Sequence, residues 1–471
     1  MEKRTFPLIL LSLFPLLLSS PAIVHAQWEP DVRLTVNDAV SQSSSIAASG
    51  DTVHVVWFDS RDGNLEIYYK RSRDGGSTWG ADTRLTWDSS GSYKPAVASQ
   101  GASVHMVWED NRDNGSIAEI YYKRTTDAGN TWSSDLRLSR NDSLWSEAPS
   151  VGVSGPMVHV TWWDGRDGNS EIYYRRSSDN GMTWGQETRL TYDYRVSTNP
   201  QICVSQGTVC IVWDETRDND TYQVYLKRST DSGLTWGQDT RLTTYPGDYE
   251  RNPSVAISDS IACVVWFDFR DGSSPEIYYT QSSDGGLSWS QDTRLTYAPG
   301  NSSLPCVAVS NTNVHVAWFD YRDSNDEIYY NLSTDGGLSW GRDTRLSYDP
   351  NYSLHASISV SGSKVHVAWD DWRAGNWEIY YKRNPTGNSG VEESISSSPI
   401  SHFPFSVHPN PFSSFTTLPG HFSERFCLYD VSGRRVGIYK GDRIGEGLVA
   451  GVYFIRAESG EGKPVRVVKV R

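Results

Sequence analysis

Acidic and basic side chains recur together in a short motif, Asp-x-Arg-Asp, which contains the charged groups used in ion pairing and ligand binding. The motif or a close variant occurs seven times, and its arginines are the candidate ligand-binding residues: Arg61, Arg112, Arg166, Arg217, Arg270, Arg322 and Arg373. A guanidinium can bind a ligand through paired hydrogen bonds, or carboxylates of its own and the following motif can hold it structurally. Ca²⁺ is a further alternative at these acidic loops, although none has EF-hand spacing. No other cofactor is expected.

A second set of side chains differs from one repeat to the next. Tyr194 and Arg195 form one such group, and Tyr249, Glu250 and Arg251 form another. A single catalytic site needs unlike residues brought together, so these five are the candidate catalytic residues. Ordinary variable surface loops are the alternative interpretation.

One position of a repeated apolar segment is occupied by histidine or cysteine: His54, His105, His159, Cys210, Cys263, His315 and His366. These are metal-binding residue types. Equivalent positions in neighbouring sheets are about 10 Å apart or more, so two imidazoles cannot share one ion. We therefore expect packed side chains and no metal site. Cys203 and Cys210 belong to one expected hairpin, where free thiols and a disulfide both remain open.

All these residues belong to one repeating unit, marked by tryptophans at intervals of 51 to 54 residues: Trp57, Trp108, Trp162, Trp213, Trp266, Trp318 and Trp369. Each unit contains four short runs rich in Val, Ile, Tyr or small residues, bounded by Gly, Asp and Ser. Such runs are typical of strands, which we name A to D in chain order. Seven units of four strands predict an all-β protein, a seven-bladed β-propeller.

The two ends of the repeat array complement each other. The first D segment, Trp28–Thr35, precedes the first A strand, and the last unit stops after its C strand, Glu378–Arg383. We expect these segments to pair, so that the N-terminal strand closes blade 7 and leaves no exposed sheet edge. With strand A innermost, the A–B and C–D turns lie on one face of the ring. The B–C and D–A loops, which carry the candidate site residues, lie on the other.

The C–D turns share a motif, Ser/Thr-x-Asp-x-Gly-x-Ser/Thr-Trp, whose aspartates are Asp74, Asp127, Asp179, Asp231, Asp284 and Asp335. This motif resembles the Asp-box, or BNR repeat, of the sialidase superfamily and related propellers. The carboxylate can accept turn N–H groups, glycine supplies a positive φ, and tryptophan packs beneath the hairpin. The resemblance implies a structural role for these aspartates and places ligand sites on the opposite face.

The same resemblance bears on catalysis. A catalytic sialidase combines several arginines that bind the substrate carboxylate, a tyrosine nucleophile activated by a glutamate, and an aspartate acid/base. The Phe/Tyr-Arg-Ile-Pro motif of that family is absent here. Whether the chain is an enzyme stays open. As a sialidase-like exo-glycoside hydrolase it would use a single site built from the five candidate catalytic residues.

The N-terminus predicts export. Residues 1–26 begin with Lys3 and Arg4, continue through a short apolar segment, and end in small residues before Gln27. This order is typical of a secretory signal peptide. Residues 27–384 then form the propeller. Residues 385–403 are rich in Ser, Pro and Gly, as expected of a linker.

Residues 404–471 resemble the C-terminal sorting domain of the type IX secretion system. The resemblance rests on His408-Pro409-Asn410-Pro411-Phe412, on Leu428-Tyr429-Asp430, and on Gly451-Val452-Tyr453-Phe454-Ile455. It implies recognition by that machinery and a secreted or cell-surface location in a Gram-negative bacterium, reached through the periplasm. Alternating apolar residues separated by glycines predict a small β-sandwich.

The composition of the chain excludes some classes of binding partner. Lys and Arg number 43 and Asp and Glu 57, and the formal net charge of −14 argues against nucleic acid. No apolar stretch after the signal peptide is long enough for a transmembrane segment. We expect a monomer that binds a glycan or a surface protein. The alternatives are the exo-glycoside hydrolase and a structural surface protein.

Overall fold

The computed structural model describes residues 28–113, 115–217, 221–243, 250–387, 425–430, 434–440, 443–444, 448–457 and 465–469. The predicted signal peptide lies outside these residues, as does most of the predicted linker. The chain divides into two compact units, Met1–Glu392 and Glu393–Arg471. Among the described residues there is no helix of the length and hydropathy needed to cross a bilayer.

Unit 1 contains seven four-stranded antiparallel sheets. The A strands are β2 (Ser41–Ser49), β6 (Ser92–Gln100), β10 (Ser146–Ser154), β14 (Ser197–Ser205), β18 (Glu250–Ser258), β22 (Ser302–Ser310) and β26 (Ser353–Ser361). The B strands are β3 (Thr52–Asp59), β7 (Ser103–Asp110), β11 (Met157–Asp164), β15 (Thr208–Glu215), β19 (Ile261–Asp268), β23 (Asn313–Asp320) and β27 (Lys364–Asp371).

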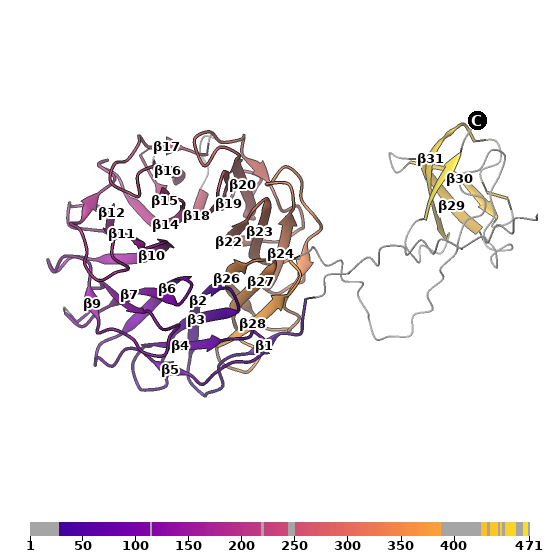
Figure 1. The fold of residues 1–471 in the computed structure, drawn as a ribbon. Helices are drawn as coiled ribbons and strands as arrows, with labels where there is room; N and C mark the ends of the chain where they lie inside the picture. Colours follow the sequence, from indigo (N-terminus) through magenta and orange to yellow (C-terminus); the bar gives the residue numbers. More distant parts are fainter. Residues whose placement is uncertain are drawn as a thin grey trace, which may run out of the picture. The chain divides into compact units, whose positions relative to one another are not determined.

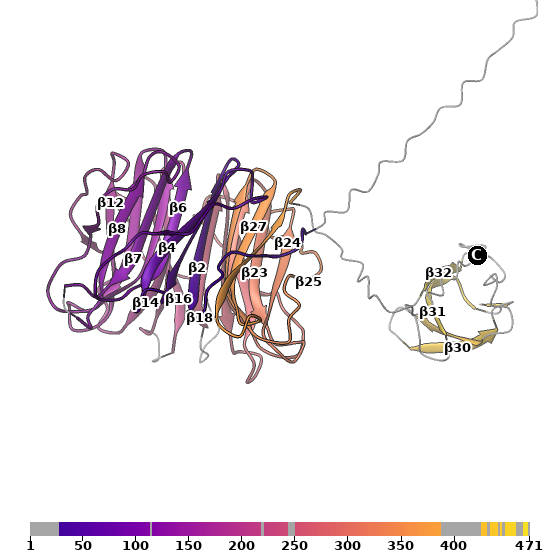
Figure 2. The same cartoon turned by 90° about the horizontal axis from the view of Figure 1, so that it is seen from below.

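The C strands are β4 (Glu66–Ser72), β8 (Glu119–Thr125), β12 (Glu171–Ser177), β16 (Gln223–Ser229), β20 (Glu276–Ser282), β24 (Glu327–Ser333) and β28 (Glu378–Asn384). The D strands are β1 (Val32–Arg33), β5 (Thr83–Arg84), β9 (Leu136–Arg137), β13 (Thr188–Arg189), β17 (Thr240–Arg241), β21 (Thr293–Arg294) and β25 (Thr344–Arg345). The sheets follow one another around a ring with the A strands innermost (Figure 1). The strands run from one face of the ring to the other (Figure 2).

The apolar runs of the B strands form strands because both of their faces are buried. Val56 packs with Met106 and Trp108 of the next sheet, whereas Trp57 packs with Tyr381 of the preceding one. Successive residues therefore alternate between two sheet-to-sheet interfaces. The Trp57 ring is fully buried, and its Nε1 donates a hydrogen bond of 3.0 Å to Asp59.

The predicted pairing of the N-terminal strand with the last C strand is confirmed. Val32 lies opposite Tyr381 in the β1–β28 ladder. Trp28 is buried, and its ring centroid is 4.9 Å from that of Tyr330 in the preceding sheet. All D strands are only two residues long, shorter than the sequence suggests. The tryptophan that precedes each of them packs against the preceding sheet, for example Trp79 against Tyr381 at 4.8 Å between centroids.

The Asp-boxes lie at the C–D turns and join neighbouring sheets. Asp179 accepts the Thr183 N–H at 2.8 Å and its hydroxyl at 2.5 Å, and these bonds lower the pKa of Asp179 to about 2. The adjacent Trp184 packs edge-on against Tyr122 of the preceding sheet, at 4.9 Å between centroids. Gly181 has a φ of +77°, and a Cβ there would lie 1.8 Å from the Tyr122 hydroxyl oxygen. Only glycine fits this position.

In unit 2, β29 (Arg425–Asp430), β30 (Arg435–Lys440), β31 (Gly451–Ala457) and β32 (Val465–Lys469) form one antiparallel sheet in the order β30-β29-β31-β32. Its core contains Phe426, Leu428 and Ile455. Residues 408–412 lie outside the described residues. The β-sandwich and the sorting domain therefore stay predictions.

Candidate functional site

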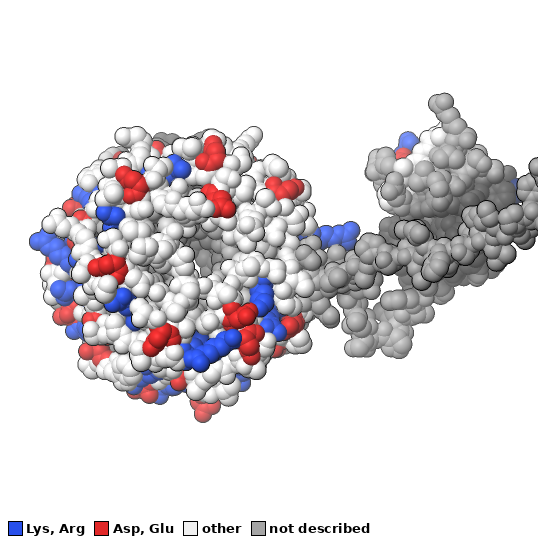
Figure 3. All heavy atoms as spheres, viewed as in Figure 1, with Lys and Arg blue, Asp and Glu red and all other residues white. Residues whose placement is uncertain are grey.

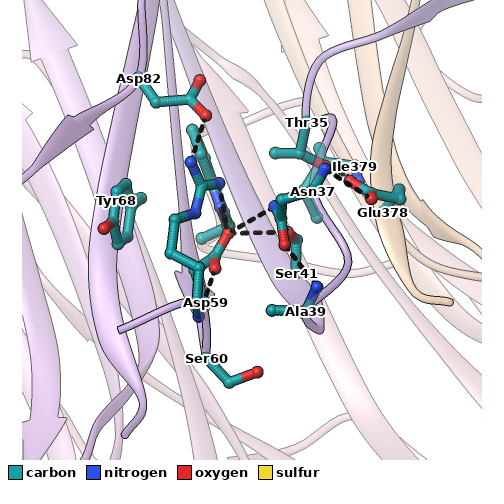
Figure 4. Close-up of polar contacts among 12 residues, drawn as sticks. Thr35, Asn37, Ala39, Ser41, Asp59, Ser60, Tyr68, Asp82, Glu378 and Ile379 are labelled. Atoms are coloured by element: carbon teal, nitrogen blue, oxygen red, sulfur yellow. Dashed lines mark hydrogen bonds and ion pairs between the residues drawn. The ribbon is translucent and has the colours of Figure 1, made fainter. Parts of the chain in front are cut away.

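The seven candidate ligand-binding arginines form a repeated set of ion pairs in the B–C loops, here called the arginine belt. Arg61 contacts Asp59 at 2.5 Å and Asp82 at 2.8 Å, and its guanidinium carbon lies 4.3 Å from the centre of the Tyr68 ring. Figure 4 shows Asp59, Asp82 and Tyr68 in this arrangement. Burial alone would raise the pKa of Asp59, but hydrogen bonds from Arg61, Trp57 and Ser41 lower it.

The arrangement is repeated in every sheet of the ring. The second carboxylates are those of Asp82, Asp135, Glu187, Asp239, Asp292, Asp343 and Asp31, for the seven arginines in chain order. Both carboxylates come from the arginine's own sheet, so the prediction of a partner in the following unit is wrong. The B–C loop folds back over the strand-C tyrosine toward its own D segment. The belt side chains are 10–23% exposed and neutralised, so they stabilise the loops.

A cavity of about 360 Å³ lies at the centre of the ring and is lined by the first halves of all seven A strands. Figure 3 shows the hollow, bordered mainly by uncharged residues. Because the A strands begin after the D–A loops, this end of the ring is the one opposite the Asp-boxes. The cavity therefore lies toward the face on which ligand binding is expected.

One residue of each A strand projects at the cavity from a left-handed backbone conformation, with φ between 47° and 55°. It occurs where the pairing of strands A and B shifts register, for example between Gln42 and Ser45. We call these residues the channel ring: Ser43, Lys94, Ala148, Asn199, Asn252, Leu304 and His355.

The left-handed conformation costs about 1–3 kcal/mol for most non-glycine residues, and asparagine, aspartate and histidine tolerate it best. Leu304, Lys94 and Ala148 are therefore strained, yet no sheet uses glycine at this position. The ring differs in residue type from sheet to sheet although its backbone does not. Such bulges commonly re-aim a side chain beside a binding site.

Three buried carboxylates lie directly behind the ring, at the position before the repeated acidic residue that ends strand B. The other sheets have Phe58, Trp163, Phe267 and Phe319 there. Each carboxylate accepts a backbone N–H from the bulge of the next sheet: Glu109 from Ala148 at 2.7 Å, Asp370 from Ser43 at 2.9 Å, and Asp214 from Asn252 at 3.4 Å.

Burial raises the pKa of Glu109 to about 7, although Lys94 and the Ala148 N–H oppose this shift. Burial likewise raises the pKa of Asp214 to about 7, against the hydrogen bond from Asn199. Both groups therefore change charge near neutral pH.

Cationic and amide groups occupy different sides of the channel ring. Lys94 Nζ lies 3.1 Å from Glu109, and its side chain is 53% exposed. His355 donates to Asp370 at 3.0 Å, and this hydrogen bond raises the pKa of His355. Lys94 and His355 stand on the two sheets that flank the first sheet, whereas Asn199 and Asn252 come from the fourth and fifth sheets. The cavity is therefore asymmetric, with cationic side chains on one side and amides on another, which sevenfold repetition alone would not produce.

The candidate catalytic residues do not line this cavity where they are described. Tyr194 is exposed, and the guanidinium of Arg195 lies 5.0 Å from the centre of its ring. Arg251 stacks on Tyr222 at 3.8 Å. Tyr249 and the side chain of Glu250 lie outside the described residues, so the Tyr–Glu pair stays a prediction.

The repeated histidines are buried in the ring as packed side chains. His54 Nδ1 lies 2.8 Å from the hydroxyl oxygen of Tyr69 in the same sheet, and burial lowers the pKa of His54 to about 4. Cys203 and Cys210 face each other across the β14–β15 ladder as free thiols. In the described part of the chain, no group of three or more His, Cys, Asp or Glu side chains is placed to hold a metal ion.

The ring of repeated four-stranded sheets is the architecture of a β-propeller. A family model described as a BNR repeat-like domain matches residues 106–367, more than half of the chain. The chain therefore belongs to the BNR repeat-like domain family. Comparison with curated proteins found no match.

Three solved structures illustrate the similarity of fold. A Dyadobacter fermentans protein of unknown function is 13% identical, with 76% of this chain and 98% of that chain covered and a TM-score of 0.50. The polysaccharide lyase Uly1 is 8% identical, with coverages of 76% and 100% and a TM-score of 0.55. A Trypanosoma rangeli sialidase mutant is 12% identical, with coverages of 76% and 59% and a TM-score of 0.46. At these identities the first two show a common fold and nothing about activity.

Proposed function

We propose that the chain is a glycan-binding module and that the central cavity holds one sugar unit of the glycan. The main observation that supports this proposal is the channel ring. Seven non-glycine residues in the left-handed conformation surround the cavity from equivalent positions, and the conformation is strained for Lys94, Ala148 and Leu304. A side chain kept at a conformational cost beside a cavity indicates that its chemistry is used there.

The size and lining of the cavity suit a small polar ligand. Its volume of about 360 Å³ lies at the small end of the range for ligand pockets. Lys94, His355 and the amides of Asn199 and Asn252 offer hydrogen-bond donors around its wall, and Leu304 offers an apolar surface. A sugar ring presents hydroxyl groups at its edge and C–H groups on its faces, which match this combination.

The lining favours binding over sialidase catalysis. Among the described residues that line the cavity there is neither an arginine nor a tyrosine. The arginines of the belt are already paired with carboxylates. The arginine cluster and tyrosine nucleophile of a sialidase site are therefore not assembled at this cavity.

A glycan array probed with the full chain tests the proposal. Lys94→Met and Asn199→Leu should each abolish binding of the captured glycan, whereas Lys364→Met should not. Lys364 is also a lysine in an ion pair, with Asp51, but it begins strand B at the opposite face. Binding unchanged in both cavity variants would contradict the proposal.

A fluorogenic sialoside assay run on the same protein tests the hydrolase alternative. We expect no turnover. Turnover that is lost in Glu250→Gln or Tyr194→Phe would establish the sialidase-like hydrolase and overturn the binding proposal.

We take the seven sheets to be one closed, seven-bladed ring, and the protein to be a monomer exported by its signal peptide and by the type IX machinery through residues 404–471. The β1–β28 pairing supports the closed ring. The formal net charge of −14 fits an extracellular glycan partner better than a nucleic acid.

A further inference from the structure

Exposed aromatic rings recur at one position on the outer part of the ring. Directly after the buried Leu-Thr or Leu-Ser pair that follows strand D, the chain places Trp87 (66% exposed), Tyr192 (73%), Tyr297 (72%) and Tyr348 (55%). We call these residues the rim platforms. Tryptophan and tyrosine side chains are usually at least partly buried, so repetition of this high exposure at equivalent positions needs an explanation.

Each tyrosine platform rests on a fixed guanidinium. The arginine carbons of Arg189, Arg294 and Arg345 lie 4.9, 4.8 and 4.9 Å from the ring centres of Tyr192, Tyr297 and Tyr348. Trp87 has Lys123 of the next sheet at 5.5 Å, and Tyr348 has Lys382 of the next sheet at 5.5 Å in addition to Arg345. At least one cation contacts each ring, and the exposed fractions show that much of each ring still meets solvent.

The guanidiniums are held in turn by their own sheets. Arg189 donates to the Thr191 carbonyl at 2.6 Å and to Glu171 at 2.7 Å, and it pairs with Asp167 at 3.1 Å. Arg345 has the equivalent partners Ser347, Glu327 and Asp323. The rings therefore lie on a rigid base and lose little freedom when a ligand stacks on them.

A partly exposed carboxylate accompanies each tyrosine platform. The side chains of Asp167, Asp271 and Asp323 are 28%, 37% and 34% exposed, and each contacts the arginine beneath the ring. An aromatic face beside a hydrogen-bond acceptor matches a pyranose, whose C–H bonds pack on the negative ring face while its hydroxyls donate.

We infer that the rim platforms are stacking subsites for a neutral polysaccharide, so that one chain engages several platforms of the ring. This inference rests on the proposed glycan-binding function and adds its ligand class and a second site, separate from the central cavity. We infer that the polysaccharide is neutral from the charges on the protein. The flanking carboxylates and the net charge of −14 repel an acidic polysaccharide.

Affinity electrophoresis of the full chain in gels that contain galactomannan, xyloglucan or laminarin tests the inference, with polygalacturonate as the acidic probe. Tyr192→Ala, Tyr297→Ala and Tyr348→Ala should each weaken retardation several-fold. The triple variant should raise the apparent dissociation constant about 100-fold, because linked weak sites multiply.

Two triple variants serve as controls. Changing the same tyrosines to phenylalanine keeps the rings and should keep the retardation. Changing Leu234, Leu287 and Leu338 to alanine removes three comparably exposed apolar side chains from the Asp-box turns and should also leave the retardation unchanged. Thermal unfolding verifies that every variant is folded.

The outcomes of the electrophoresis and of the glycan array distinguish the rim platforms from the central cavity. Retardation unchanged in the triple alanine variant, stronger retardation by polygalacturonate than by the neutral polysaccharides, or no retardation by any of them would overturn the inference. Array binding that is lost in Lys94→Met but kept in the triple alanine variant leaves the cavity proposal standing alone. The reverse pattern supports the rim platforms and overturns the cavity.

Discussion

Glu109 and Asp214 occupy a position where four other sheets place an aromatic ring. Each is buried, and each accepts a backbone N–H from the next sheet. Burial raises both pKa values to about 7, well above the ordinary values of these carboxyl groups. The two residues therefore make the stability of two sheet-to-sheet interfaces depend on pH.

The direction in which the free energy of unfolding changes with pH follows from the linkage between proton binding and folding. A carboxyl group whose pKa is raised on folding binds more protons in the folded than in the unfolded state between the two pKa values. Its stabilising effect is complete below about pH 4 and is lost as the pH rises through about 7. We expect the free energy of unfolding to fall by about 1–3 kcal/mol per group between pH 5 and pH 8.

Denaturant unfolding at several pH values measures this dependence. Glu109→Gln and Asp214→Asn keep an oxygen that accepts the backbone N–H but cannot ionise, so each should flatten the pH profile. Asp259→Asn, a change at an exposed A–B turn, should leave it unaltered. A wild-type protein that gains stability from pH 5 to pH 8, with no difference in the two variants, would show that these carboxyl groups are ionised throughout.

The bulged A strand has the same backbone conformation in every sheet, but the side chain that it turns toward the cavity varies between sheets. Its register shift recurs in all seven A–B pairs and turns one residue per sheet toward the cavity. The pairing of the A and B strands is the same in every sheet, so the side chain at the register shift differs between sheets while the backbone does not.

Ala148→Gly tests that strain. Ala148 has a φ of 52°, so glycine should raise the free energy of unfolding by about 0.5–1 kcal/mol. Ala48→Gly is the matched control, since Ala48 lies in the regular part of the β2–β3 ladder, where glycine should lower stability by a similar amount. Equal destabilisation by both changes in denaturant unfolding would mean that Ala148 is unstrained.

The sequence predicts the elements well because each strand type repeats with recognisable residues, such as Trp57 in strand B and Asp74 in the C–D turn. The channel ring could not be predicted from the sequence, because its members have a backbone conformation in common but no common residue type. One signal was present: an acidic residue replaces an aromatic one at Glu109, Asp214 and Asp370. The rim platforms were also visible, as aromatic residues after a repeated Arg-Leu-Thr/Ser.

At the scale of the whole molecule, the ring depends on its last sheet, which is built from both ends of unit 1. Besides the β1–β28 ladder, Arg373 pairs with Asp31 at 2.6 Å, and Arg383 contacts Glu29 at 2.6 and 2.9 Å. The buried Trp28 completes the interface with the sixth sheet.

Deleting residues 27–36 should therefore lower the melting temperature of the whole ring in one transition. Loss of the Trp28 side chain alone is expected to cost about 3–5 kcal/mol. Trp28→Ala should reproduce part of the effect, and Val36→Thr, next to the ladder and 75% exposed, should reproduce none of it. A calorimetric trace unchanged by the deletion would contradict a closed ring.

The closing ladder also determines how unit 1 responds to mechanical force. The backbone N–H of Glu29 bonds to the Arg383 carbonyl at 3.0 Å, so the two chain ends leave the sheet side by side. A pull applied to both ends loads the bonds of β1 and β28 one after another, as in unzipping, and not all together in shear. The sheet that completes the ring is thus also the one that tension opens first, while the six sheets built from continuous chain stay out of the path of the load.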